Sequence, residues 1–346
     1  MKDQRMCKSI RFLPVLAGLF VIAVAPAATI SEDFSVNPVQ NGWSIFGNAG
    51  QFYWNPTNHN IEVIWDSAQP NSYLYHPLGT ILSRSDDFRI DFDLLLRDAV
   101  SGNETGKTTA MEIGIGLLNL AKATSTNFMR GVFGSAPSLF EFDYFPPGYY
   151  EYNGSTNDVP ATTTPTFIST NSFTYAPTVF APYSFELPTD TLIHVSLTYT
   201  AANQTLATLL TTNGLTMFHP PNVVLTDTNA SAFTDSDDYL VDAFSISSYS
   251  SAGDDYDSVL VHGIIDNVSL TFPHAVENLT GSFSNGVWQT QFLSRSNWTY
   301  TLERSPNLHS WAGVSLPVPG TGSNLSLQDT NPPLGSAMYR VGANRP

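Results

Sequence analysis

Hydrophobic and polar residues alternate along much of the chain. In the segment 88–96, one side of an extended strand would carry Phe88, Ile90, Phe92, Leu94 and Leu96. The other side would carry Arg89, Asp91 and Asp93. The same period of two recurs at 61–65, 111–117 and 193–199, and it is typical of half-buried β-strands. The pattern of an amphipathic helix of three turns is not found after residue 27, so the chain is predicted to be all-β.

Two further segments refine the predicted strand order. The strand at 193–199 leads through Ala201-Ala202-Asn203-Gln204 into a second apolar segment at 206–210, which predicts a hairpin. The segment 160–166, P-A-T-T-T-P-T, is predicted to be a loop because proline cannot donate a ladder hydrogen bond. Many short strands separated by such turns predict a two-sheet antiparallel sandwich or barrel.

The first 27 residues have the layout of a secretory signal peptide. Basic residues at Lys2, Arg5, Lys8 and Arg11 precede an apolar run at 12–24, and Ala25-Pro26-Ala27 offers small residues for cleavage. The apolar run is too short to span a membrane. The sequence therefore predicts a secreted, extracytoplasmic protein that loses its one cysteine, Cys7, on cleavage.

A domain boundary is predicted near Pro273. The segment 263–272, G-I-I-D-N-V-S-L-T-F, has the pattern of a last strand, so the first domain is predicted at 28–273. Residues 274–346 have a hydrophobic pattern of their own, which predicts a small C-terminal β-module. The expected core of that module is Trp288, Phe292, Trp298, Tyr300, Leu302, Trp311, Tyr339 and Val341.

Composition and charge restrict the partners. Only 13% of the residues are charged, and the formal net charge is −16. An excess of negative charge argues against nucleic acid as a partner, and no second apolar run has the length of a membrane span. An extracellular glycan or a surface protein is the expected partner class.

The segment 138–152, S-L-F-E-F-D-Y-F-P-P-G-Y-Y-E-Y, is the strongest candidate for a site. Glu141 and Asp143 are two residues apart in a predicted strand, so both carboxylates would lie on one face. An aromatic loop follows, and its Tyr144, Tyr149 and Tyr150 are candidate stacking groups for a sugar. An outward polar face, and tyrosines that cover their own core, are the alternative interpretations of this segment.

Several motifs, in this order along the chain, resemble the concanavalin-like jelly roll. They are E-D-F-S with G-W-S-I-F-G, the central E-F-D, the hairpin L-T-Y-T-A-A-N-Q-T-L, and the closing I-D-N-V-S-L-T-F. The resemblance covers 30–273 and is shared with legume-type lectins, laminin-G-like modules, several glycoside hydrolases and exported bacterial proteins of this type. It implies a two-sheet antiparallel jelly-roll sandwich.

The lectin resemblance implies a cation site and a sugar site. Glu141 and Asp143 match the two metal-binding carboxylates of the lectin strand, whereas Pro147 replaces its asparagine. Two carboxylates provide few of the six to eight oxygens that calcium prefers, so a calcium ion is expected to bind there only weakly. The sugar-binding aspartate is missing, and Glu112 is its displaced substitute.

The hydrolase resemblance lacks a proton donor. The second glutamate of the E-x-D-x-E or E-x-D-x-x-E motif would fall at Phe145 or Pro146, and neither side chain can donate a proton. The sequence therefore predicts a non-catalytic binding module, with a glycan as its ligand. The alternative is a structural or surface-matrix protein that makes protein contacts, and a glycoside hydrolase ranks third.

Overall fold

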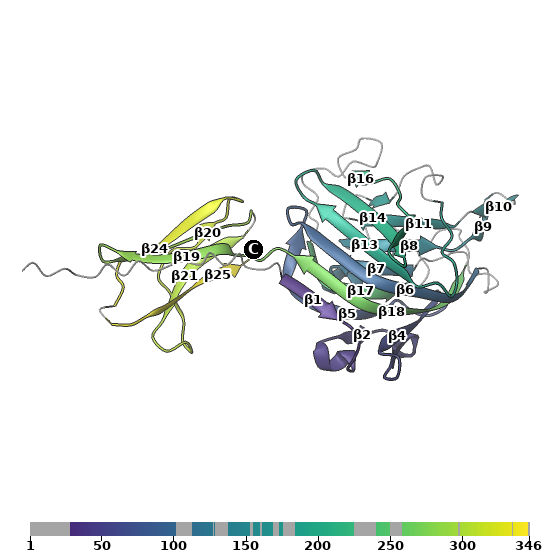
Figure 1. The fold of residues 1–346 in the computed structure, drawn as a ribbon, viewed down its shortest axis with the longest axis horizontal. Coiled ribbons are helices and arrows are strands. Elements are labelled where there is room, and N and C mark those ends of the chain that lie inside the picture. The colour runs from purple at the N-terminus through teal and green to yellow at the C-terminus, as the bar shows by residue number, and fades with distance from the viewer. Residues whose placement is uncertain are drawn as a thin grey trace, which may run out of the picture. The chain divides into compact units, whose positions relative to one another are not determined.

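The protein is described from a computed structural model, which defines residues 28–101, 113–126, 128, 138–152, 155–159, 161–168, 173–175, 184–224, 240–249, 258–296, 298–333 and 335–344. The chain forms two compact units, Ala27–His274 and Ala275–Pro346. Figure 1 shows both as assemblies of β-strands.

The first unit contains a nine-stranded sheet. Its strands follow the order β15 (Leu215–Phe218), β14 (Thr205–Thr212), β13 (Ile193–Thr200), β6 (Phe88–Ser101), β18 (Val259–Phe272), β4 (Asn60–Asp66) and β3 (Phe52–Asn55). In addition, β1 (Ala28–Glu32) pairs with β18, and β16 (Val223–Val224) pairs with β14.

A seven-stranded sheet completes the sandwich. Its order is β12 (Phe173–Tyr175), β11 (Thr162–Ile168), β8 (Leu139–Phe145), β7 (Ile113–Leu118), β17 (Leu240–Ser248), β5 (Ser72–Ser83) and β2 (Ser44–Phe46). A separate hairpin consists of β9 (Gly148–Tyr152) and β10 (Ser155–Val159). The helical segments are η1 (Pro38–Asn41), η2 (Ala49–Gln51) and α1 (Leu120–Ala123).

Aromatic side chains join the two sheets in the core. The ring of Phe88 on β6 packs edge-on against Phe140 on β8 at 4.8 Å between centroids. Phe92 and Phe142 make the same kind of contact at 5.8 Å. Because the named strands pair antiparallel, this unit is a two-sheet antiparallel jelly-roll sandwich, as the sequence predicts.

The first and last strands of this unit meet, since β1 pairs with β18 from Ala28 opposite Phe272 to Glu32 opposite Val268. The predicted hairpin is formed by β13 and β14. The alternating apolar residues of β6 are buried, from Phe88 through Leu96.

The loop prediction at 160–166 is wrong. Residues 162–168 form β11, which pairs with β8 along its whole length. The strand β12 pairs only with Thr166, Phe167 and Ile168, so Pro165 lies where β11 has one partner strand. A missing N–H is tolerated at such a position, and the proline therefore did not exclude a strand.

The second unit contains two small sheets. One is three-stranded, in the order β19 (Glu277–Ser284), β20 (Val287–Leu293) and β24 (Asn324–Asp329). In the four-stranded sheet, β21 (Thr299–Ser305) pairs with β22 (Ala312–Gly313), β23 (Val318–Pro319) and β25 (Met338–Asn344).

This unit has a core of its own. Phe292, Tyr300, Leu302 and Leu327 are buried in it, and Trp288, Trp298, Tyr339 and Val341 pack against them. Trp311, which the sequence pattern placed in the core, lies outside this cluster, beneath the guanidinium of Arg340. None of the helices in the described ranges has the length and hydrophobicity of a membrane-spanning helix.

Candidate functional site

Glu141 and Asp143 lie on the same face of β8, as the sequence predicts. The alternate residues, Phe140 and Phe142, point into the core and contact the nine-stranded sheet. The two carboxylates therefore lie on the face of the seven-stranded sheet that points away from that core.

That face is closed to solvent around the carboxylates. Glu141 and Asp143 are 0% exposed. The hydroxyl of Tyr249 donates a hydrogen bond to Oε1 of Glu141. The Tyr249 ring packs edge-on against Tyr73 and Phe128, at 5.8 and 6.1 Å between centroids.

The helical segment α1 also covers this face. The hydroxyl of Tyr73 donates to the backbone oxygen of Ala123, at the end of α1, at 3.2 Å. The acid pair thus lies in an enclosed polar layer and not in an open groove.

Two glycines of β7 make room for this layer. A Cβ at Gly114 would lie 2.7 Å from Cε2 of Tyr249 and 3.2 Å from Cδ of Glu141. A Cβ at Gly116 would lie 2.0 Å from the backbone oxygen of Phe140, which is closer than real Cβ contacts. The bare backbone of β7 therefore lets the Tyr249 side chain reach Glu141 across the sheet.

The three tyrosines that the sequence analysis placed in an aromatic loop lie in strands, Tyr144 in β8 and Tyr149 and Tyr150 in β9. Tyr144 is buried at 1% exposure, and burial raises the pKa of its hydroxyl to about 12. Tyr149 and Tyr150 lie in β9, opposite Asp158 and Asn157 of β10. Glu112 lies outside the described residues.

Within the described ranges, no group of three or more His, Cys, Asp or Glu side chains is arranged to hold a metal ion. The weak calcium site at Glu141 and Asp143 stays a prediction.

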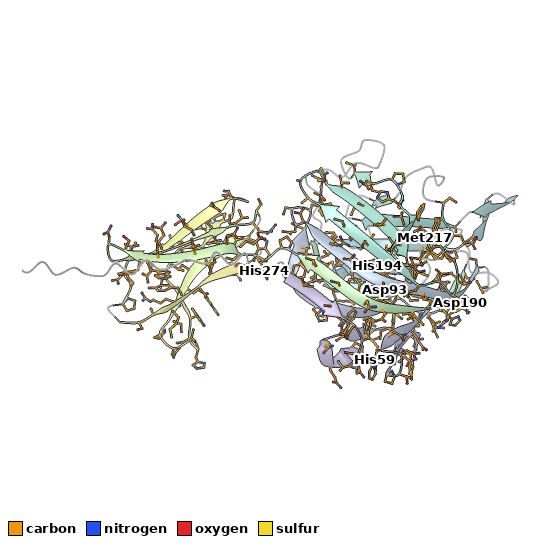
Figure 2. All side chains as sticks on the ribbon, viewed as in Figure 1. His59, Asp93, Asp190, His194, Met217 and His274 are labelled. Carbon is orange, nitrogen blue, oxygen red and sulfur yellow. The ribbon has the colours of Figure 1, made fainter. Side chains whose placement is uncertain are left out.

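A polar recess of about 280 Å³ lies on the outer face of the nine-stranded sheet. Its floor includes Asp93 of β6 and His194 of β13, which are directly opposite each other. Its walls are the segment 190–192 before β13 and the segment 211–214 at the end of β14. Figure 2 labels Asp93, Asp190 and His194 on this sheet.

Alternation along the strands directs these side chains outward. The neighbours of Asp93, Phe92 and Leu94, are fully buried, and so is Ile193 beside His194. The His194 side chain is 44% exposed, whereas that of Asp93 is 16% exposed. A partly covered carboxylate beside an accessible imidazole gives the recess a polar floor.

Hydrogen bonds hold Asp93 in place. Nδ1 of His194 lies 2.8 Å from Oδ1 of Asp93, and it donates because an ionised carboxylate only accepts. Nδ2 of Asn267 donates to Oδ2 of Asp93 at 2.8 Å. Both oxygens keep lone pairs for a further donor.

A second carboxylate beside His194 is paired with an arginine. Asp91 accepts two hydrogen bonds of 2.7 Å from Arg89 and another from the hydroxyl of Ser196. Burial opposes ionisation of Asp91, but the hydrogen bonds from Arg89 and Ser196 outweigh it and lower the pKa of this carboxyl.

The wall at 211–214 presents polar groups to the recess. The side-chain amide of Asn213 and the hydroxyl of Thr211, which lies opposite His194, make no hydrogen bond to any of the residues that the structure describes. An amide both donates and accepts, and a hydroxyl does the same, so this wall can bind the hydroxyl groups of a ligand.

A tight turn positions this wall. Asn213 and Gly214 have φ values of 49° and 75°, and they connect β14 to β15. Two successive left-handed residues are typical of a type I′ hairpin turn, for which Asn-Gly is the favoured pair. The Asn213-Gly214 dipeptide is a sequence signal for this hairpin turn, and it was not among the predicted turns.

No protein-family model and no curated protein sequence matches the chain. Among solved structures, a peanut lectin with a 9mer peptide is similar at a TM-score of 0.38 and 16% identity, covering 72% of this chain and 100% of that one. A basic winged bean lectin with Tn-antigen has a TM-score of 0.40 and 10% identity, covering 71% and 100%. An alginate lyase mutant, Aly36B with alginate trisaccharide, has a TM-score of 0.38 and 11% identity, covering 72% and 99%.

Proposed function

We propose that this protein is an exported, non-catalytic binding module whose ligand is a glycan. The ligand binds in the recess between β6, β13 and β14, and not beside Glu141 on the opposite sheet. The observation that carries the proposal is the wall at 211–213, where the side chains of Thr211, opposite His194, and of Asn213 have no hydrogen-bond partner among the described residues.

The size and chemistry of the recess suit one unit of a larger glycan. Small-molecule pockets occupy roughly 300–1,000 Å³. At about 280 Å³, this recess takes a small, hydroxyl-rich group. A carboxylate at Asp93, an amide at Asn213 and a hydroxyl at Thr211 supply the acceptors and donors that sugar hydroxyls need.

The arrangement around the recess supports binding without catalysis. His194 and Asp93 form a pair that could act as a base, but the serine hydroxyl on the same strand, Ser196 Oγ, bonds to Asp91 instead. A nucleophile must lie within reach of its base to be activated. On β8, Phe145 still occupies the position where the hydrolases carry a proton donor.

A glycan array with purified protein tests the proposal, and Asn213→Gly is the informative variant. Glycine tolerates the positive φ of residue 213, so this change removes the amide without backbone strain. Loss of one hydrogen-bonding group should weaken binding of the captured glycan about three- to tenfold.

Asn203→Gly is the matched control. Asn203 lies in the turn at the other end of β14, between Thr200 and Thr205, and is absent from the recess. It should bind like the wild type. Absence of any captured glycan, or equal binding by Asn213→Gly and the wild type, would overturn the proposal.

The calcium site is tested in the same experiment. Arrays run with calcium and with a chelator should give the same captured glycans, because the recess does not include Glu141 or Asp143. Any calcium bound at that pair should be weak, at about 10⁻⁴–10⁻³ M. A calcium requirement that Asp143→Asn removes would move the glycan site to β8.

A second candidate function is a surface-matrix protein that makes protein contacts. The closed face over Glu141 favours it, because that face offers no open groove. Exposed Leu279 and Phe283 on β19 of the second unit, at 52% and 63%, also favour it. Concentration-dependent self-association that Phe283→Ser removes, together with an empty glycan array, would support this function instead.

A further inference from the structure

We infer that the recess selects glycans that carry amino groups over glycans that carry carboxylates. This inference rests on the proposed function, since it names the class of glycan that the same site accepts. It comes from the balance of charged side chains around Asp93.

Two carboxylates beside the recess have no lysine or arginine partner among the described residues. Asp93 and Asp266 are directly opposite each other on β6 and β18. Among the described residues, neither makes an ion pair with lysine or arginine, although Asp93 bonds to His194. The two arginines nearby are paired elsewhere, Arg89 with Asp91 and Arg97 with Asp190, at 2.7 and 3.0 Å.

One asparagine holds the two carboxylates together. The backbone N–H of Asn267 donates to Oδ1 of Asp266 at 2.7 Å, while its side-chain amide donates to Asp93 at 2.8 Å. Both N–H groups of Asn267 are neutral donors. They satisfy oxygen lone pairs of Asp93 and Asp266 but do not neutralise the charge of either carboxylate.

The negative charges near Asp266 make this carboxyl harder to ionise. Its pKa is raised by burial and further by the charges of Asp93 and Asp33, although the hydrogen bond from Asn267 opposes this. A positive charge arriving at Asp93 would relieve that repulsion. A negative charge arriving there would add to it.

Ligand chemistry follows from this balance. A protonated amine has three donors and forms charge-assisted hydrogen bonds, which are about twice as strong as neutral ones. N-acetylation removes the charge but keeps an N–H donor. A uronic acid would place its carboxylate beside Asp93, which has no lysine or arginine partner among the described residues.

Three oligosaccharides of equal length test the inference: a glucosamine, an N-acetylglucosamine and a uronic acid oligomer. Titration calorimetry at low salt and near-neutral pH, where part of the amines carries a proton and an imidazole is mostly neutral, should give the tightest binding for the glucosamine oligomer. The advantage over the acetylated oligomer should be about three- to tenfold. It should shrink at high salt, because salt screens the attraction between partly exposed charges.

Asp93→Asn should remove the preference for the amine while the acetylated oligomer still binds. Asp266→Asn should reduce the same preference, and it is the variant to measure if Asp93→Asn fails to fold. Asp98→Asn is the control, because Asp98 pairs with His262 on the same sheet but does not line the recess.

The outcomes separate the two claims. Equal affinity for the amine and acetylated oligomers, or tighter binding of the uronic acid, overturns the inference and leaves the proposed function standing. Absence of binding by all three oligomers to the wild-type protein overturns the inference alone. If the array also captures no other glycan, the proposed function is overturned as well.

Discussion

The hydroxyl of Tyr249 donates a hydrogen bond to Glu141, 108 residues away, across the bare backbone of Gly114. Both side chains are buried, at 1% and 0% exposure. A buried carboxylate depends on its hydrogen bonds, because it has lost the water that would otherwise solvate it. The bond therefore contributes to stability and also fixes the end of β17 against β8.

Tyr249→Phe should lower the free energy of unfolding by about 1–3 kcal/mol, since it deprives a buried carboxylate of one donor. Urea denaturation followed by tyrosine and tryptophan fluorescence measures this. Tyr53→Phe is the control, because Tyr53 is 59% exposed and its change should stay within about 0.5 kcal/mol. Equal stabilities of Tyr249→Phe and the wild type would contradict the structural role of the bond.

Glycine at position 116 should be intolerant of substitution. In Gly116→Ala the new Cβ would meet the backbone oxygen of Phe140 at 2.0 Å, and backbone cannot turn aside as a side chain can. The cost should be at least about 1–3 kcal/mol, as for other overpacked sites. Gly335→Ala, where nothing lies within 4 Å of the new Cβ, should be nearly neutral in the same denaturation experiment. A Gly116→Ala protein as stable as Gly335→Ala would show that β7 and β8 are farther apart than described.

The sandwich was predictable because its strands follow the period of two. Ile61, Val63 and Trp65 of β4 are each 1% exposed, and the apolar residues of β13 are equally buried. Such patterns depend on local geometry alone, so one sequence suffices to read them. The strand β11 was missed because the tolerance of Pro165 depends on the absence of a second partner strand at that position, which the local sequence does not show.

The candidate site was harder to predict for the same reason. The alternation put Glu141 and Asp143 on one face correctly, but their burial depends on Tyr249 and α1, which come from distant parts of the chain. The recess joins Asp93 to Asn213, and these residues meet only through the order of strands β6, β13 and β14.

Asp266→Asn should stabilise the protein at neutral pH. Burial, together with the charges of Asp93 and Asp33, raises the pKa of Asp266 above its ordinary value of 3.8. The folded state therefore holds the proton more tightly than the unfolded state, and stability is lost as pH rises through the raised pKa. Asparagine removes this loss while it keeps an oxygen for the N–H of Asn267, so a gain in stability is expected.

The pH dependence is the decisive measurement for Asp266→Asn. The variant and the wild type should have equal melting temperatures below about pH 3.8, and the variant should melt higher above the raised pKa. Asp33→Asn should instead melt lower than the wild type at neutral pH. A hydrogen bond from the backbone of Ser35 lowers the pKa of Asp33, so its ionised form stabilises the folded state. If Asp266→Asn melts lower than the wild type at neutral pH, the repulsion assigned to this carboxyl is wrong.

The two compact units should unfold in two separate transitions, and Tyr300→Phe should shift only one of them. Tyr300 is fully buried in the core of the second unit, where its hydroxyl accepts from the N–H of Arg295 and donates to the oxygen of Ala275, both at 2.7 Å. Loss of this hydroxyl should cost that unit about 1–3 kcal/mol, or roughly 4–24 °C in Tm for a domain of this size. Tyr199→Phe is the matched control in the first unit, since its buried hydroxyl donates to the oxygen of Arg84 at 2.8 Å and its change should shift only the other transition. Differential scanning calorimetry distinguishes the outcomes, and a single transition that both variants shift equally would mean that the units fold as one.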